Sequence, residues 1–195
     1  MKNIVVFASG SGSNFQSIID AVESGKINAR ITGLISNKDG IKALERAGRH
    51  NIPTRILNES VFEDYQDYEK ELLLQLAVWD TDLIALAGYL RKIPVSVINR
   101  YEHRILNIHP SLLPKFGGKG FYGIKVHQAV IASKEAESGC TIHVVTKEFD
   151  EGPVLEQSKV PVKSDDTPQT LAARVLEQEH ILYPKVIANY LTTLD

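Results

Sequence analysis

The chain has 195 residues, with 22 Lys and Arg against 24 Asp and Glu and a formal net charge of −2. This balance argues against a nucleic-acid partner held by bulk electrostatics, and 43% hydrophobic residues indicate an ordinary folded domain. The single cysteine, Cys140, excludes an internal disulfide and cysteine-cluster zinc sites, and a reducing, cytosolic compartment is the simplest interpretation. The longest clean apolar run, residues 83–87, is far shorter than the ~20 residues of a membrane span.

The first half of the chain alternates short β-rich runs with helical patterns. Strands are predicted over residues 3–8, 30–36, 54–57 and 83–87, and helices over residues 14–24, 41–50 and 64–79. Such alternation predicts an α/β fold: a doubly wound, mostly parallel sheet with right-handed crossovers.

The second half is less regular. It predicts a strand over residues 105–109, a helix over 124–133, and two further strands, over 141–146 and 153–162. The last two flank a turn and predict an antiparallel hairpin at one edge of the sheet. A long helix is predicted over residues 167–190, with Pro184 marking a kink or a break. No linker separates the halves, so we expect one domain with two lobes.

A glycine- and serine-rich loop follows the first predicted strand. Residues 10–14 read Gly-Ser-Gly-Ser-Asn, and such small residues can aim backbone N–H groups at an anion beside the positive end of the next helix. Phe15 stands where a dinucleotide fingerprint requires its third glycine, and no Lys-Ser or Lys-Thr closes a P-loop. The loop therefore fits a phosphomonoester better than a pyrophosphate. The alternative is a structural turn with Ser13 or Asn14 as the helix N-cap.

A second candidate site lies at the end of the strand predicted over residues 105–109. Asn107 and His109 alternate along it, so both side chains point to one face, and ligands of open α/β sheets bind outside the carboxyl ends of strands. His109 can act as a general acid or base, while Asn107 can hydrogen-bond an oxyanion. Asp150, in a Gly-Pro turn, would favour the charged form of His109 and raise its pKa if the two meet. The alternatives are a structural core histidine and ordinary turn chemistry at Asp150.

The sequence shows no pattern typical of a metal site or of a serine hydrolase. The remaining histidines show no i, i+4 pairing, so no metal-ligand spacing emerges. No Gly-x-Ser-x-Gly elbow indicates a serine hydrolase.

Four segments together resemble a known family. They are residues 9–14, residues 86–91, the Leu-Asn-Ile-His-Pro-Ser-Leu-Leu-Pro run at 106–114, and the Asp-x-Gly-Pro-Val turn at 150–154. Over nearly the whole chain they resemble the phosphoribosylglycinamide formyltransferases, which are folate-dependent enzymes of purine synthesis. The Asn-x-His-Pro-Ser-Leu-Leu-Pro run is specific for folate formyltransferases as a class, and the Gly-Ser-Gly-Ser-Asn loop points to the ribonucleotide enzyme within that class.

The resemblance implies transfer of a formyl group from 10-formyltetrahydrofolate to the amine of phosphoribosylglycinamide, with no metal. It implies one formyltransferase domain, residues 1–195, with a Rossmann-like nucleotide half (1–100) and a catalytic and folate half (101–195). The implied catalytic residues are Asn107, His109 and Asp150. Residues implied to bind phosphoribosylglycinamide are Gly12, Ser13, Asn14, Leu176, Glu177, Gln178 and Glu179. Residues implied to bind the folate are Leu90, Arg91, Lys92, Ile93, Asn107, Thr146, Lys147, Glu148, Phe149 and Asp150.

The chain departs from the family pattern in two places. The stretch over residues 115–126 is longer than the family loop, which supplies another histidine near the nucleotide, and Lys125 is expected near that place. Tyr65 stands where family members often carry an arginine near the folate tail.

Several other functions share parts of this pattern. Methionyl-tRNA formyltransferase shares the chemistry of the His-Pro-Ser-Leu-Leu-Pro run, but its chain is longer and carries an added RNA-binding domain. Formyltetrahydrofolate hydrolase normally carries an additional N-terminal domain. A non-catalytic nucleotide-binding module on the same sheet would leave Asn107 and His109 unexplained. We therefore expect small-molecule partners rather than nucleic acid or membrane, and no residue pattern indicates an oligomeric state.

Overall fold

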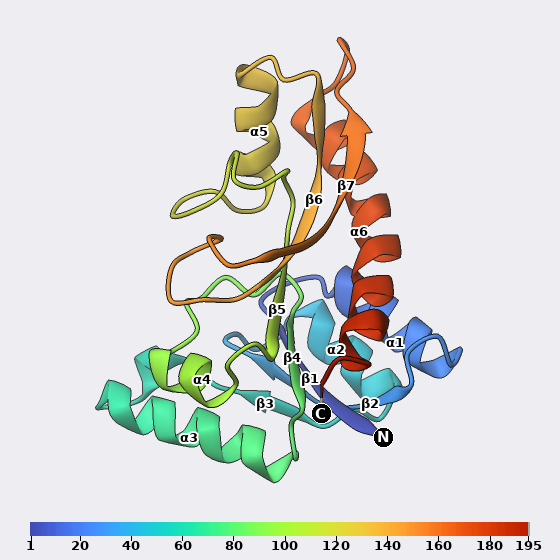
Figure 1. Ribbon diagram of the computed structural model, residues 1–195. Helices are drawn as coiled ribbons and strands as arrows, with labels where there is room; N and C mark the ends of the chain where they lie inside the picture. Colours follow the sequence, from blue (N-terminus) through green and yellow to red (C-terminus); the bar gives the residue numbers. More distant parts are fainter. Residues whose placement is uncertain (195) are drawn as a thin grey trace.

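A computed structural model describes residues 1–194 as one seven-stranded sheet with the order β3-β2-β1-β4-β5-β6-β7 (Figure 1). The parallel strands are β1 (Lys2–Ala8), β2 (Ala29–Ser36), β3 (Thr54–Ile56), β4 (Leu83–Leu86) and β5 (Ile105–His109). The antiparallel strands are β6 (Glu137–Val144) and β7 (Val154–Pro161). The predicted fold class, a mostly parallel doubly wound sheet with an edge hairpin, is confirmed.

Helices cover both faces of the parallel strands. The helices on one face are α1 (Ser13–Glu23), α2 (Lys42–Arg49) and α6 (Pro168–Leu191), and those on the other are α3 (Tyr65–Val78) and α4 (Val95–Arg100). Successive residues of β1 alternate between two apolar cores: Ile4 and Val6 pack on the α1 and α6 side, while Val5 and Phe7 pack on the α3 side. A strand buried on both faces reads as a continuous apolar run, which is the pattern that its sequence shows.

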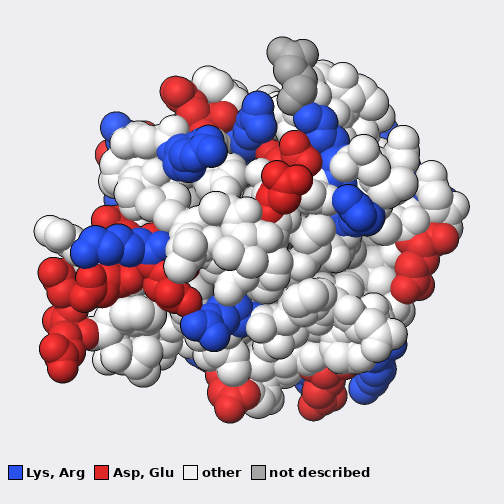
Figure 2. Space-filling view, turned by 90° about the horizontal axis from the view of Figure 1, so that it is seen from below, with Lys and Arg blue, Asp and Glu red and all other residues white. Residues whose placement is uncertain are grey.

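The remaining elements shape the far end of the molecule. The helix α5 (Ile124–Ala132) lies beside the outer part of the β6–β7 hairpin, and a single 3-10 turn, η1 (Glu59–Val61), precedes α3. No helix among residues 1–194 is long and apolar enough to cross a membrane. The face turned toward the viewer in Figure 2 carries acidic and basic side chains interspersed.

The structure differs from the sequence prediction in four details. The strand β6 begins at Glu137 rather than residue 141, because its first residues pair with the end of β7. The short elements α4 and η1 were not predicted, since six- and three-residue helices carry little periodicity. The helix α6 continues through Pro184 without a break. Gly12, rather than Ser13 or Asn14, is the N-cap of α1.

Candidate active site

A cavity of about 930 Å³ opens at the carboxyl edge of the sheet. After β1 the chain builds β2 and β3 on one side, then crosses to build β4 and β5 on the other, so the strand order reverses between β1 and β4. Ligands of doubly wound sheets bind at such a reversal, because the loops that leave neighbouring strands diverge there and leave a crevice. Its walls come from residues 10–14, 86–93, 107–110, 118–124 and 145–150, and from α6.

The loop of residues 10–14 is held against α2. Gly12 has a φ of 68°, and a Cβ built on it would lie 2.8 Å from the Cβ of Ala43, so a side chain there meets both strain and a clash. The Ala43 N–H donates to the Gly10 carbonyl at 3.2 Å, and the Arg46 Nε–H donates to the Ser11 carbonyl at 3.0 Å. The loop therefore presents the N-terminus of α1, with its free N–H groups, in a fixed position at the cleft.

Beside this loop, Asn14 donates a hydrogen bond of 2.6 Å from its Nδ2 to Oε2 of Glu179 on α6. Glu179 is buried, and burial raises the pKa of its carboxyl to about 7, with the Asn14 hydrogen bond opposing the rise.

Only part of the expected α6 segment reaches the cleft. Leu176 and Glu179 line it, because residues three apart share a helix face. Glu177 is exposed, and Gln178 instead accepts a hydrogen bond of 2.9 Å from the Ser158 hydroxyl on β7. The structure thus places Glu177 and Gln178 away from the cleft, in contrast to the expectation for both.

Four polar side chains form a cluster between β5, β6 and the turn after β6. Asn107 lies opposite His143 in the antiparallel register, and its Nδ2 donates to Nε2 of His143 at 3.0 Å. The Asp150 carboxylate lies between the two imidazoles: its Oδ1 is 3.5 Å from Nε2 of His143, and its Oδ2 is 3.5 Å from Nδ1 of His109. The structure therefore brings Asn107, His109 and Asp150 together, as the family resemblance implies.

His143 was not singled out by the sequence analysis. It is buried, and its Nδ1–H donates to the Val144 carbonyl at 3.1 Å, which leaves Nε2 as the acceptor for Asn107. The signal available in the sequence was the Thr141-x-His143 alternation, which matches Asn107-x-His109 on the neighbouring strand. Recognising it required the hairpin register, which periodicity alone does not supply.

The loop after β5 covers this cluster. The Phe116 carbonyl accepts a hydrogen bond of 2.8 Å from Nε2 of His109, and the Gly118 N–H donates to Oδ2 of Asp150 at 2.9 Å. Both ring nitrogens of His109 thus face acceptors supplied by the protein.

Burial is the largest influence on the pKa values of His109 and of the nearby His127. It lowers the pKa of His109 below its ordinary value, although the Asp150 charge and the Phe116 carbonyl both act to raise it. Asp150 thus acts on the pKa of His109 in the expected direction, but the net pKa is lowered because desolvation is the larger effect. His127 on α5 is buried near His109, and burial lowers its pKa to about 4, so it is neutral at pH 7.

A slot between residues 86–93 and 145–150 forms the other end of the cleft. The Leu90 N–H donates to the Ser9 hydroxyl at 2.9 Å, which fixes the backbone of the segment against β1. The Lys92 ammonium lies 5.3 Å from the ring centroid of Phe149, so the two sides of the slot touch through a cation–π contact. The residues expected to bind folate from 90 to 93 and from 146 to 150 line this part of the cleft, and Asn107, the remaining one, lines the cleft within the polar cluster.

Of the two departures from the family pattern, the stretch of residues 115–126 lines the cleft through residues 118–124, whereas Tyr65 and Lys125 lie outside the lining. Tyr65 is half exposed on α3 and packs against Tyr68. The Lys125 ammonium donates to the Tyr122 hydroxyl at 3.1 Å, so the structure does not place it where the cleft would need it. Among residues 1–194, no group of three or more His, Cys, Asp and Glu side chains could hold a metal ion.

Comparison with known proteins identifies the class of this fold and site. Residues 2–187 match the formyl transferase family, and the chain belongs to that family. It is 41% identical to phosphoribosylglycinamide formyltransferase of Escherichia coli K12, over 95% of this chain and 85% of that protein. It is 45% identical to the chloroplastic phosphoribosylglycinamide formyltransferase of Vigna unguiculata, over 95% of this chain but only 60% of that relative's length. The crystal structure of glycinamide ribonucleotide transformylase 1 from Symbiobacterium toebii superposes with a TM-score of 0.93 at 35% identity, covering 99% of this chain and 89% of that one.

Proposed function

We propose that this protein transfers a formyl group from 10-formyltetrahydrofolate to the amine of phosphoribosylglycinamide, a step of purine biosynthesis. The observation that carries the proposal is the cluster of Asn107, His109, His143 and Asp150, which lines one cleft together with the loop of residues 10–14 and the segments 90–93 and 146–150. The names of the relatives, including the Escherichia coli protein that the chain matches over 85% of its length, support the same reaction.

The nucleotide is assigned to the wall formed by α1 and α6. The backbone N–H groups at Gly12, Ser13 and Asn14 are the donors for the phosphate. Glu179, held by Asn14, is placed to accept hydrogen bonds from sugar hydroxyls, and Leu176 supplies an apolar wall. Glu177 and Gln178, which lie outside the cleft, have no role in this assignment.

The folate is assigned to the slot. Backbone groups of residues 90–93 read the edge of the pterin ring, and residues 146–150 close the opposite side. Bound 10-formyltetrahydrofolate supplies the formyl carbon that the amine attacks, and negative charge develops on the formyl oxygen in the transition state.

The polar cluster is assigned to that oxygen and to the proton of the amine. The Asn107 amide has two N–H groups, of which one is held by His143, so the other can donate to the oxygen. His109, when its Nε2–H leaves the Phe116 carbonyl, supplies a second donor. Asp150 favours the charged form of His109 against the effect of burial, and it can pass the amine proton through water to the folate nitrogen, which leaves as its bond to the formyl carbon breaks.

This assignment requires residues 116–118 to move. The Phe116 carbonyl occupies the hydrogen bond that the substrate oxygen needs, so the loop must release His109 when substrates bind. Small-molecule partners, a cytosolic location and a division into nucleotide and folate halves belong to the same proposal.

An assay with both substrates tests the proposal. The purified chain is mixed with phosphoribosylglycinamide and 10-formyltetrahydrofolate, and the formylated nucleotide is followed by mass spectrometry. Formylated product supports the proposal. Free formate in place of that product would indicate a hydrolase, formylation of another acceptor alone would indicate a different formyltransferase, and tight binding with no turnover would indicate a binding module.

A further inference from the structure

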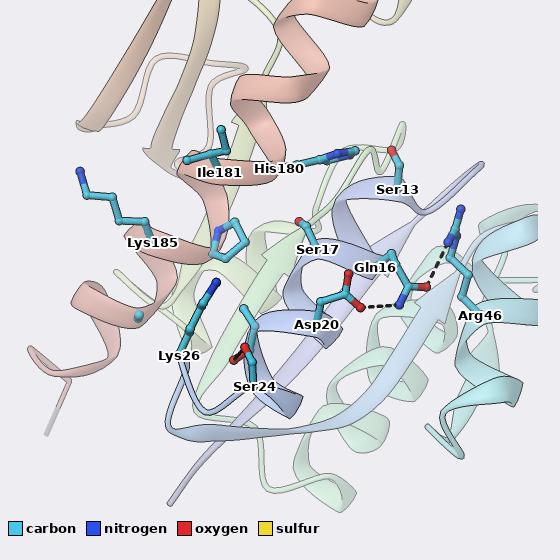
Figure 3. Close-up of a pocket in the computed structure, with 13 residues that line it drawn as sticks. Ser13, Gln16, Ser17, Asp20, Ser24, Lys26, Arg46, His180, Ile181 and Lys185 are labelled. Atoms are coloured by element: carbon cyan, nitrogen blue, oxygen red, sulfur yellow. Dashed lines mark hydrogen bonds between the residues drawn. The ribbon is translucent and has the colours of Figure 1, made fainter.

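A second hollow adjoins the loop of residues 10–14, and Ser13 lines both this hollow and the active-site cleft. It has a volume of about 690 Å³ and runs between α1 and α6, with Arg46 of α2 at one end (Figure 3). Its α1 side is made by side chains from Ser13 to Ser24, a helical span of roughly 16 Å at 1.5 Å per residue. We call this hollow the α1–α6 groove. Its volume falls within the range of roughly 300–1,000 Å³ typical of small-molecule sites.

Basic groups lie at both ends of the groove. Lys26, which follows α1, is exposed, and Figure 3 shows its side chain reaching toward α6. At the other end, Arg46 uses two of its five N–H donors on the Ser11 carbonyl and on Oε1 of Gln16, each at 3.0 Å. His180 faces this end, and its Nε2 is buried without a hydrogen-bond partner.

Acceptors lie between these two ends. Asp20 carries a carboxylate on the middle of the α1 side and takes one hydrogen bond, from Gln16 at 2.8 Å. The Ser17 hydroxyl donates its proton to the Asn14 carbonyl at 2.8 Å, so it faces the groove as an acceptor. Pro184 has no N–H for the helical hydrogen bond to the His180 carbonyl, which adds an acceptor on the α6 side.

We propose that the α1–α6 groove binds a nucleoside monophosphate. The phosphate pairs with Lys26, the sugar hydroxyls donate to Asp20 and Ser17, and the polar edge of the base accepts from Arg46 and His180. Ala21, Pro184 and Ala188 supply apolar contacts along the groove. A separate anion alone would leave the acceptors in the middle unused, and a neutral nucleoside would leave Lys26 without a counter-charge.

The groove shares its framework with the cleft. Ser13 lines both hollows, and neighbours in sequence face opposite ways: Glu179 lines the cleft, whereas His180 lines the groove. Arg46 connects the groove directly to the loop through the Ser11 carbonyl. A ligand that draws Arg46 toward itself therefore weakens the support of the anion-binding loop, so binding in the groove is expected to change the affinity of the cleft for phosphate.

Nuclear magnetic resonance locates such binding without relying on the enzymatic activity. The ¹⁵N-labelled full chain is titrated with adenosine 5′-monophosphate, ribose 5-phosphate and inorganic phosphate in separate experiments. Lys26→Glu reverses the charge at the phosphate end. Lys134→Glu, which changes an exposed lysine after α5, is the matched control.

The expected result is a saturable shift of the Ser24, Lys26 and His180 amides with the nucleotide, with a smaller response at Ser11 and Gly12. Lys26→Glu should weaken the apparent affinity by tenfold or more for both sets of amides, and Lys134→Glu should leave it unchanged. Three results would overturn the proposal. They are shifts confined to residues 10–14 that persist in Lys26→Glu, equal affinity for inorganic phosphate and for the nucleotide, and no saturable shift with any probe.

Discussion

The loop of residues 10–14 and the loop of residues 115–123 close on the same cleft, but they are held in different ways. The first is tied to the scaffold, through Ala43 and Arg46 of α2. The second is tied to the polar cluster, since the Phe116 carbonyl accepts a hydrogen bond from Nε2 of His109 and the Gly118 N–H donates to Asp150.

This difference separates a preformed binding surface from one that the proposed reaction requires to move. Donors fixed to α2 need no rearrangement when an anion arrives, so binding energy is not spent on ordering them. A loop that occupies the hydrogen bonds of His109 and Asp150 competes with the substrate, and it keeps both groups paired when the cleft is empty. Substitutions on the two sides are therefore expected to affect different quantities: turnover and its pH dependence at the covered cluster, and binding and stability at the fixed loop.

The largest expected effect is at His109. Replacing it with alanine removes both the acid and the oxyanion donor, and general acid–base groups typically contribute about 10²–10⁴-fold to a rate. We expect kcat to fall by that amount while the dissociation constants of both substrates change little, because the contact forms mainly in the transition state. Steady-state kinetics with separate binding measurements check this. His103→Ala, at an exposed histidine, is the control and should retain full turnover.

Asp150→Asn tests whether the His–Asp pair acts as one unit. The carboxylate raises the pKa of His109 against burial, so its loss should lower that pKa further. If the rate depends on the protonated ring, it falls as pH rises through that pKa, and the fall should move to lower pH in the variant. Turnover of the double variant, which combines Asp150→Asn with His109→Ala, should be little below that of His109→Ala alone. Losses that multiply would mean that Asp150 acts independently of His109.

Glu179 should make stability depend on pH on the fixed side of the cleft. Its folded-state pKa of about 7 lies above the ordinary value of 4.5, so the folded protein holds this proton more tightly than the unfolded chain does. The contribution is fully present below pH 4.5 and is lost as pH rises through about 7. At 1.36 kcal/mol per pKa unit, the difference is of the order of 3 kcal/mol. Denaturant unfolding of Glu179→Gln, which cannot titrate, should show a flatter profile between these pH values than the parent protein. An unchanged slope would contradict the assignment to Glu179.

Gly12 and Gly10 form a matched pair on the same loop. Gly12→Ala places a Cβ at a φ of 68° and 2.8 Å from that of Ala43, while Gly10 has open space around its Cα. We expect Gly12→Ala to lower the free energy of unfolding by about 1–3 kcal/mol and to weaken nucleotide binding. Gly10→Ala should leave both nearly unchanged. Calorimetry with phosphoribosylglycinamide and thermal unfolding of both variants measure these effects. Equal behaviour of the two variants would mean that backbone geometry at Gly12 does not shape the site.

The sequence predicted those features that depend on local pattern. The apolar strands β1 and β4, the amphipathic α3 and the edge hairpin follow from periodicity, and the strand-end position of Asn107 and His109 follows from the strand assignment. The partnership of His143 with Asn107 depends on the register of an antiparallel pair, which a one-residue shift would change. The net pKa of His109 depends on how deeply the later loop buries it, and no local pattern carries that information.

The smallest effect is expected at Phe149, which lines the slot. Its ring is 44% exposed and makes one described polar contact, the cation–π pair with Lys92 at 5.3 Å. Such a contact at an exposed site is worth about 0.5–1 kcal/mol, or a few-fold in a binding constant. Phe149→Leu should therefore raise KM for the folate by a few-fold with kcat unchanged, and Phe149→Tyr, which keeps a π face over Lys92, should behave like the parent. A large loss of kcat in Phe149→Leu would show that the turn holding Asp150 depends on this ring. The slot and the catalytic cluster would then form one rigid unit, and the contrast between a fixed and a mobile side of the cleft would have to be redrawn.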